Sequence, residues 1–266
     1  MSMLRGYWAV LRGSFMVGVI YRFGFIFTIL GNIFYMAVTY YLWRSIYANT
    51  TTLRGMTFNQ TYLYVALGSA IFVLFKTYAD WFISYEIREG AIATYLIKPI
   101  DYQLYSLAVS LGSMLMNLAA ITLPAAILLI FVYRIPIQWG PGLMVFPLSL
   151  LLAYLINFSF DYFIGITGFY SESIWGISIT KDVIISVLSG ALIPLQFFPQ
   201  AAQKILMLLP FQAMYHTPLM MITNPNQGWD AIFSMLAIQA IWVVVIFVLT
   251  RLFYNQAIKV LRVAGG

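Results

Sequence analysis

Four ionisable side chains in long apolar segments are the first candidates for chemistry in this sequence. Lys76 and Asp80 lie four positions apart, Asp161 stands alone within NFSFDYF, and His216 is the one histidine. An ionisable group inside a bilayer is costly unless it is paired or hydrated, so such groups often mark an ion or substrate path. The spacing of Lys76 and Asp80 also lets them pair on one helix face. We favour this self-neutralising pair over an ion relay.

Asp161 and His216 have no partner close by in the sequence. We expect Asp161 to pair with an arginine from another helix; the alternative is that it faces an inward cavity. A single imidazole without nearby carboxylates makes a poor metal site, so His216 is predicted to be a packed, hydrogen-bonded core residue.

Enzyme signatures are missing from the sequence. It contains no GxxxxGK[ST] loop for ATP, no HExxH, CxxC or GxSxG motif, and no cysteine. We therefore expect no catalytic residue, no metal and no cofactor in this chain.

The composition is that of a membrane protein. Of the 266 residues, 62% are hydrophobic and only 8% are charged, whereas soluble domains have roughly 45–50% apolar and about 25% charged residues. The net charge of +6 comes without a basic run, so nucleic acid is not an expected partner. Basic residues that flank membrane spans account for it.

An all-α membrane protein with six transmembrane helices in a single domain over residues 1–266 is predicted. A span needs about 20 mainly apolar residues. Six segments qualify, at about Val17–Trp43, Thr61–Phe82, Leu104–Tyr133, Leu143–Phe169, Asp182–Phe198 and Ala231–Phe253. Residues 1–16, with arginines among aromatic and aliphatic side chains, suit an interfacial helix; the alternative is a frayed tail.

Lysine and arginine orient these spans through the positive-inside rule. With a cytoplasmic N-terminus, the inner side holds Arg5, Arg12, Arg22, Arg88, Lys98, Lys181, Arg251, Lys259 and Arg262, and the outer side holds Arg44, Arg54, Arg134 and Lys204. We therefore predict that both termini are cytoplasmic.

The segment YEIREGAIATYLIKPIDY, residues 85–102, then becomes the largest cytoplasmic loop. We predict a weakly amphipathic helix of about three turns that ends before Pro99. Its apolar side would carry Ile87, Ala91, Ile92, Tyr95 and Leu96, and its polar side Glu86, Glu89 and Gly90. Such a helix suits docking to another protein; the alternative is a polar connector.

The loop after the fifth predicted span is apolar but interrupted by prolines. Its apolar pieces are too short to cross a bilayer, so residues 194–228 are predicted to dip into the outer leaflet and return, packed against the spans.

These motifs resemble the six-span permease subunits of type-2 ATP-binding-cassette (ABC) exporters. EIREGAIATYLIKPIDY is similar to the coupling-helix region of that family. LSGALIPLQFFPQAAQKILMLLPFQAMYHTPLMMI is similar to its glycine and proline pattern after the fifth span, and FYSESIWGI to an aromatic-acidic-tryptophan motif.

The resemblance implies roles and partners. Two permease subunits, identical or similar, would surround a pathway, and separate ATPase subunits would bind ATP and Mg. Coupling to the ATPase would fall to residues 85–101, namely Glu86, Ile87, Arg88, Glu89, Gly90, Tyr95, Lys98 and Pro99, with Glu172 and Lys181 as a secondary cytoplasmic contact. An outer gate would comprise Pro194, Phe198, Pro199, Pro210 and Phe211. An amphipathic or hydrophobic substrate (lipid, drug or peptide), a bacterial plasma membrane and contact with its lipids are also expected.

Two other classes remain in view. A six-span secondary transporter or channel would require Asp161, Lys76 or Asp80 to face a shared aqueous path. An intramembrane enzyme is disfavoured, because the spans carry no nucleophile-base pair or metal constellation.

Overall fold

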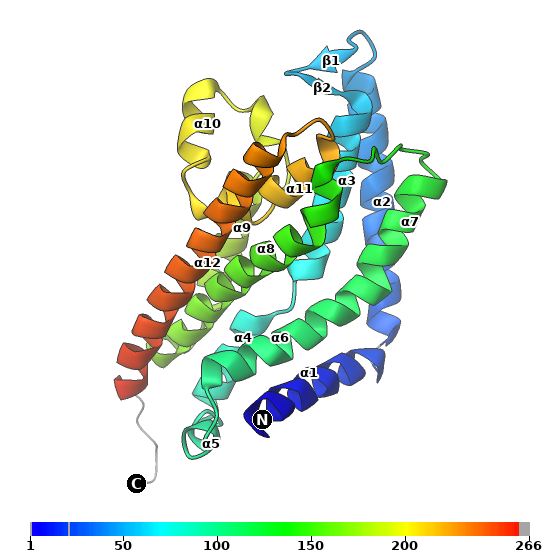
Figure 1. Cartoon of the computed structure of the whole chain (residues 1–266). Helices are drawn as coiled ribbons and strands as arrows, with labels where there is room; N and C mark the ends of the chain where they lie inside the picture. Colours follow the sequence, from blue (N-terminus) through cyan, green and yellow to red (C-terminus); the bar gives the residue numbers. More distant parts are fainter. Residues whose placement is uncertain (1, 21, 261–266) are drawn as a thin grey trace.

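The computed structural model describes residues 2–20 and 22–260, which are mostly helical (Figure 1). The longer helices are α1 (Ser2–Ile20), α2 (Arg22–Ile46), α3 (Phe58–Phe75), α4 (Ala79–Arg88), α6 (Tyr102–Asn117), α7 (Leu123–Phe131), α8 (Pro141–Ile166), α9 (Trp175–Leu188), α11 (His216–Thr223) and α12 (Trp229–Ala257). Shorter elements are α5 (Ala93–Leu96), α10 (Gln200–Leu206), the π-helix Leu118–Thr122, and the 3-10 turns Thr167–Phe169, Leu195–Phe197, Pro210–Ala213 and Ile258–Val260. Strands β1 (Thr52–Leu53) and β2 (Met56–Thr57) form a small antiparallel hairpin.

Within the described residues, five helices are long and apolar enough to cross a membrane. They are Gly24–Ile46, Phe58–Arg88, Tyr102–Phe131, Pro141–Phe169 and Trp229–Val260. The predicted span at residues 182–198 is not among them, and the helix in this region begins and ends earlier, at Trp175 and Leu188. The helix in that region, α9, has 14 residues and is about 21 Å long, short of the roughly 30 Å of a bilayer core.

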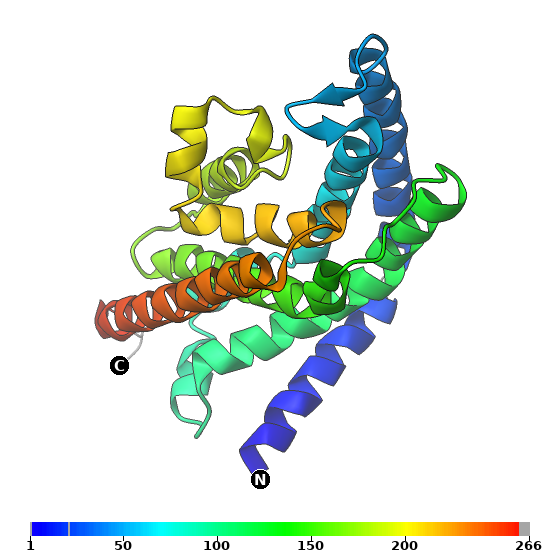
Figure 2. The same ribbon diagram turned by 45° about the horizontal axis from the view of Figure 1, so that its top comes forward.

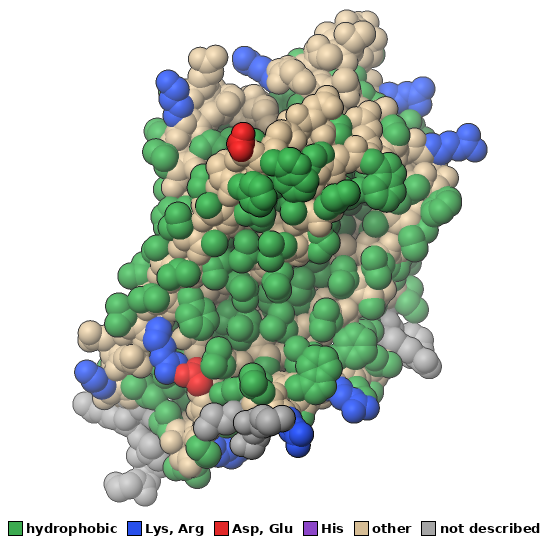
Figure 3. Space-filling model, in the orientation of Figure 1, with side chains coloured by type: hydrophobic (Ala, Val, Ile, Leu, Met, Phe, Trp, Pro, Cys, Tyr) green, Lys and Arg blue, Asp and Glu red, His purple; other side chains and the backbone are tan. Residues whose placement is uncertain are grey.

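An exposed apolar band surrounds the middle of the molecule, as a membrane protein requires. On α12, for example, Phe233, Ile241 and Val244 are each at least 60% exposed. Figure 3 shows the band in green, with basic side chains gathered toward the two ends. One end carries β1 and β2 and is called the hairpin end; the other carries α5 and is called the α5 end (Figure 1).

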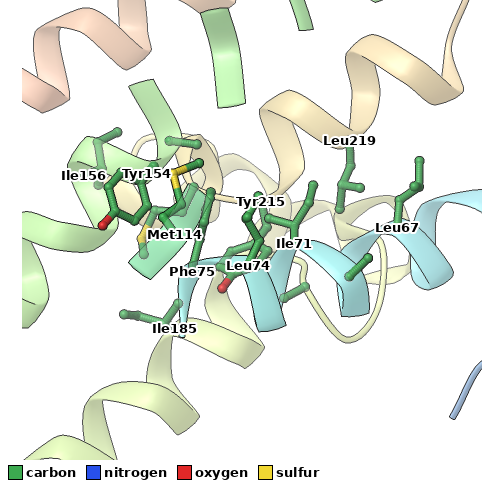
Figure 4. Packing of buried hydrophobic residues seen from close by; sticks show 14 of the residues in the cluster. Leu67, Ile71, Leu74, Phe75, Met114, Tyr154, Ile156, Ile185, Tyr215 and Leu219 are labelled. Carbon is green, nitrogen blue, oxygen red and sulfur yellow. The ribbon is translucent and has the colours of Figure 1, made fainter. Parts of the chain in front are cut away.

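Helix α8 lies at the centre and packs against α4, α11 and α12. Its Tyr154 meets Phe75 at the end of α3, with 5.7 Å between ring centroids, and Phe75 meets Tyr215 at 5.6 Å. Figure 4 shows these rings among other buried side chains. Helix α11 lies against both α8 and α3 (Figure 2).

Helix α1 packs along α6 rather than along α2 (Figure 1). Gly112 permits this close approach, because a Cβ there would lie 2.4 Å from the carbonyl oxygen of Leu11. The Ser14 hydroxyl adds a hydrogen bond of 2.7 Å to the carbonyl of Val109. Farther along, Pro124 lacks an N–H, and the helical ladder widens into the π-helix that joins α6 to α7.

Candidate functional site

The helix that starts at Phe58 breaks between α3 and α4, at Lys76–Tyr78. Tyr78 has φ +55°, in the left-handed region that a non-glycine residue rarely adopts. The sequence predicted a span over residues 61–82, and the candidate span Phe58–Arg88 covers this range; the break within it was not predicted. Such breaks inside a membrane protein are tolerated where other groups satisfy the freed backbone.

Two asparagines supply that satisfaction. The Asn117 side-chain amide on α6 donates to the carbonyls of Val73, Leu74 and Lys76, at 3.2, 3.4 and 3.3 Å. The Asn157 amide on α8 donates to the carbonyl of Phe75 at 3.4 Å. The end of α3 is therefore capped by side chains from two other helices.

Five charged residues, here called the charge cluster, meet beside this break. They are Lys76, Asp80, Asp161, Lys181 and Asp182. Lys181 lies at its centre: its Nζ is 3.1 Å from Asp80 Oδ2 and 3.2 Å from Asp182 Oδ1, and it also pairs with Asp161. The cluster joins α9 to α3, α4 and α8.

Neutral donors complete the cluster. Asn157 Nδ2 donates to Asp161 Oδ2 at 3.1 Å, and Asp80 accepts from the Ser178 hydroxyl and the Trp81 N–H. Asp80, Asp161 and Lys181 are 3%, 5% and 9% exposed. Buried charges are stable only with such pairing and hydrogen bonding, and each of the three aspartates has an ion-pair partner here, although the two lysines and three aspartates leave a formal charge of −1.

The structure corrects three expectations for these residues. Lys76 and Asp80 do not pair with each other, because the helix breaks between them; Lys76 pairs with Asp182 instead. Asp161 does find a partner on another helix, but this partner is a lysine. The Lys181 amine is buried, so it cannot form part of a cytoplasmic contact surface.

Residues 85–101 at the α5 end form two short helical pieces instead of one three-turn helix. Gly90, with φ +72°, ends α4 in the left-handed region, and α5 has only four residues. Glu86 was predicted on the polar side but is 6% exposed. It accepts hydrogen bonds from the hydroxyls of Tyr95 (2.9 Å) and Tyr102 (2.7 Å), which tie the loop to α6.

Burial, followed by hydrogen bonding to Tyr105 and Glu86, raises the pKa of Tyr95, so the Tyr95 hydroxyl remains a hydrogen-bond donor.

The remaining surface of this loop is available to a partner. Ile97 is 85% exposed. The other predicted coupling residues divide into Ile87, which is buried, and Arg88, Glu89, Lys98 and Pro99, which are exposed. Arg88 Nη1 also donates to the carbonyl of Glu172 at 2.9 Å, which brings these two predicted contacts together.

Of the predicted outer-gate residues, Pro194, Phe198 and Pro199 lie just before α10, which is toward the hairpin end (Figure 1), whereas Phe211 packs on the second half of α8. Pro194 and Pro199 immediately precede the turn Leu195–Phe197 and α10, and Pro210 is the first residue of the turn Pro210–Ala213, a place that proline favours. The ring of Phe211 stacks on Phe160 of α8 with centroids 5.5 Å apart. Phe198 is half-buried and ends the turn that begins after Pro194.

His216 lies buried at the start of α11, as predicted. Its Nδ1 is 3.2 Å from the Tyr64 hydroxyl, and burial lowers the pKa of the imidazole to about 4. Among the described residues there is no group of three or more His, Cys, Asp or Glu placed to hold a metal ion.

A large apolar cavity was missed by sequence reasoning. It has a volume of about 600 Å³ and lies between α2, α3 and α9. Tyr35, Phe72 and Val183 contribute apolar wall, Asn32 and Ser69 polar points, and Asp182 of the charge cluster reaches it. Gly31 and Gly68 leave room for it, but glycines alone do not predict a cavity.

Comparisons with known proteins agree with this architecture. A family model described as "ABC-2 family transporter protein" matches residues 33–265. No curated protein matches the chain.

Proposed function

The chain belongs to the ABC-2 family of transporter proteins, and we propose that it is the membrane subunit of an ATP-driven exporter. Family membership makes it a transmembrane component of an ABC transporter, and such a component associates with an ABC ATPase subunit. The finer proposal is that ATP and Mg bind to that separate subunit and that transport runs out of the cytoplasm. We place the chain in a bacterial cell membrane with both termini cytoplasmic.

The apolar cavity is the observation that supports the proposed class of substrate. Its walls are largely apolar with a few polar points, as is typical of a site for an amphipathic or hydrophobic molecule. This chain encloses the cavity only in part. A second permease subunit, identical or similar, would close it and complete a pathway through the membrane.

Helix α4 supports a route for the energy input. At one end it continues into the exposed loop at residues 89–100, where the ATPase would dock. At the other end, Asp80 is ion-paired with Lys181 of α9, which lines the cavity. A push on the loop would pivot α4 about Tyr78 and shift α9 through this ion pair.

The six-span secondary carrier finds less support. It needs an unpaired charge in an aqueous path, whereas Lys76, Asp80 and Asp161 are paired within the charge cluster. The cavity beside these residues is of about 20 Å³, little more than room for one water.

Two experiments test the proposal. Purification from native membranes should yield a complex with an ATP-binding subunit, and a chain that transports without one would refute the proposal. In the reconstituted complex, Glu89→Lys should uncouple ATP hydrolysis from transport, since Glu89 is exposed on the docking loop. Asp230→Lys, an equal charge change at the hairpin end, is the matched control and should transport normally. Equal transport by both variants would remove the docking role.

A further inference from the structure

We propose that the hairpin end binds the headgroup of an anionic phospholipid in a shallow cavity beside Arg44. The cavity has a volume of about 710 Å³ and lies where α2 ends, the chain turns into β1, and α3 begins. Its polar lining comes from Arg44, Ser45, Thr50, Thr51 and Asn59. This site is independent of the transport proposal and requires only that the chain spans a membrane.

The lining offers donors that the protein does not use. Arg44 forms no ion pair with any described residue, and no aspartate or glutamate lines the cavity. In the described chain, the side chains of Ser45, Thr50, Thr51 and Asn59 also make no hydrogen bond. An arginine surrounded by hydroxyl and amide donors matches the oxygen atoms of a phosphate.

The lining also distinguishes among headgroups. An ethanolamine ammonium would meet no carboxylate here. A choline group would need an open aromatic face, but Arg44 already lies over the Tyr40 ring, 6.0 Å from its centroid. A phosphate that carries hydroxyls, as in phosphatidylglycerol, finds partners throughout the cavity.

The cavity lies at the level of lipid headgroups. Beside it the candidate span of α2 ends at Ile46, and the exposed side chains of Tyr41 and Arg44 lie on its last turns. Tyrosine concentrates at membrane–water interfaces, and an arginine near the end of a span extends toward them.

Acyl chains would also find a surface here. On α2, Tyr41, Leu42 and Ile46 are exposed next to Arg44. With the orientation proposed above, this is the outer leaflet.

The charge of the whole end favours an anion. It carries Arg44, Arg54, Arg134 and Lys204 but only Asp230 among the described acidic residues, and Figure 3 shows basic side chains spread over it. General attraction alone would not select Arg44, however. The proposal requires the cavity, with its hydroxyl groups, to give binding beyond that of an exposed arginine.

Native mass spectrometry of the purified full chain can test this. We would titrate dioleoyl phosphatidylglycerol and dioleoyl phosphatidylcholine into protein in neutral detergent. Wild type should bind phosphatidylglycerol about tenfold more tightly than phosphatidylcholine, which is the effect of one charge-assisted contact. Arg44→Gln should lose that preference. Arg134→Gln, which removes an equal charge elsewhere on this end, should keep it.

Two further measurements separate binding in the cavity from attraction by charge alone. Thr50→Val with Thr51→Val leaves the charge unchanged and should still weaken phosphatidylglycerol binding severalfold. Glycerol phosphate, which has no acyl chains, should not displace phosphatidylglycerol when it is added at the concentration at which the lipid saturates the protein. The proposal would be overturned if Arg44→Gln kept the lipid preference, or if Arg44→Gln and Arg134→Gln lost it equally. It would also be overturned if the threonine variant bound as tightly as wild type, or if glycerol phosphate competed fully.

Discussion

Replacement of Lys181 by methionine tests the energetic role of the charge cluster. Methionine keeps the length of the side chain and removes the ammonium group. Asp80 and Asp161, which are 3% and 5% exposed, would then lose their cationic partner in the interior. Asp161 would retain one amide donor, and Asp80 a hydroxyl and a backbone N–H.

The expected loss of stability follows from this burial. Removing one partner of a buried ion pair costs about 3–5 kcal/mol, because the remaining charge has no compensation. At about 2–4 °C of Tm per kcal/mol for a chain of this size, Tm should fall by about 10 °C. Lys76→Met is the matched control: the side chains of Lys76 and Asp182 are 29% and 27% exposed, so we expect about 1 kcal/mol or less.

Thermal unfolding of the detergent-purified variants would measure these differences. Adding Asp161→Asn to Lys181→Met should recover about 1–2 kcal/mol, because it removes one of the unpaired charges. If Lys181→Met unfolds at the wild-type temperature, or if Asp161→Asn makes it worse, the cluster does not stabilise the fold in the way described.

Three further predictions concern other features. Asn117→Leu should lower the free energy of unfolding by about 1–3 kcal/mol, because it leaves backbone carbonyls at the end of α3 without a donor; chemical denaturation checks this, and a neutral result would contradict the capping. Gly112→Ala should separate α1 from α6 and expose α1 to protease, whereas Gly13→Ala on α1, where a Cβ meets nothing within 4 Å, should not. The pKa of His216 is about 4 in the folded chain against about 6.5 unfolded, so its stabilisation is present above pH 6.5 and is lost as pH falls toward 4. The loss reaches about 3 kcal/mol, and His216→Gln should flatten that part of a plot of Tm against pH.

Sequence patterns predicted the parts of this protein that depend on local properties. Apolar length identified the five candidate spans of the described residues, since a bilayer demands long apolar segments. Prolines were predicted to interrupt the loop after residue 193, and the structure has only short helical elements there, for a local steric reason. The burial of His216 was predicted because a single imidazole without carboxylates near it in the sequence makes a poor metal site.

Features that depend on long-range contacts were not predictable. The continuous apolar run over residues 61–75 gives no sign that the helix breaks at Lys76, because the groups that cap its end, Asn117 and Asn157, come from other helices. Likewise, Lys181 was placed on the cytoplasmic surface by the positive-inside rule. That rule counts charges and does not detect partners twenty and a hundred residues away.

The separation of these partners also bears on how the protein is made. Lys76 and Asp80 are synthesised about a hundred residues before Lys181 and Asp182, which neutralise them. During synthesis, α3 and α4 therefore enter the membrane region before α9 supplies the partners that Lys76 and Asp80 have in the folded chain. Completion of the charge cluster thus requires α9, and the ion pairs that join α3 and α4 to it form only after residues 181 and 182 have been made.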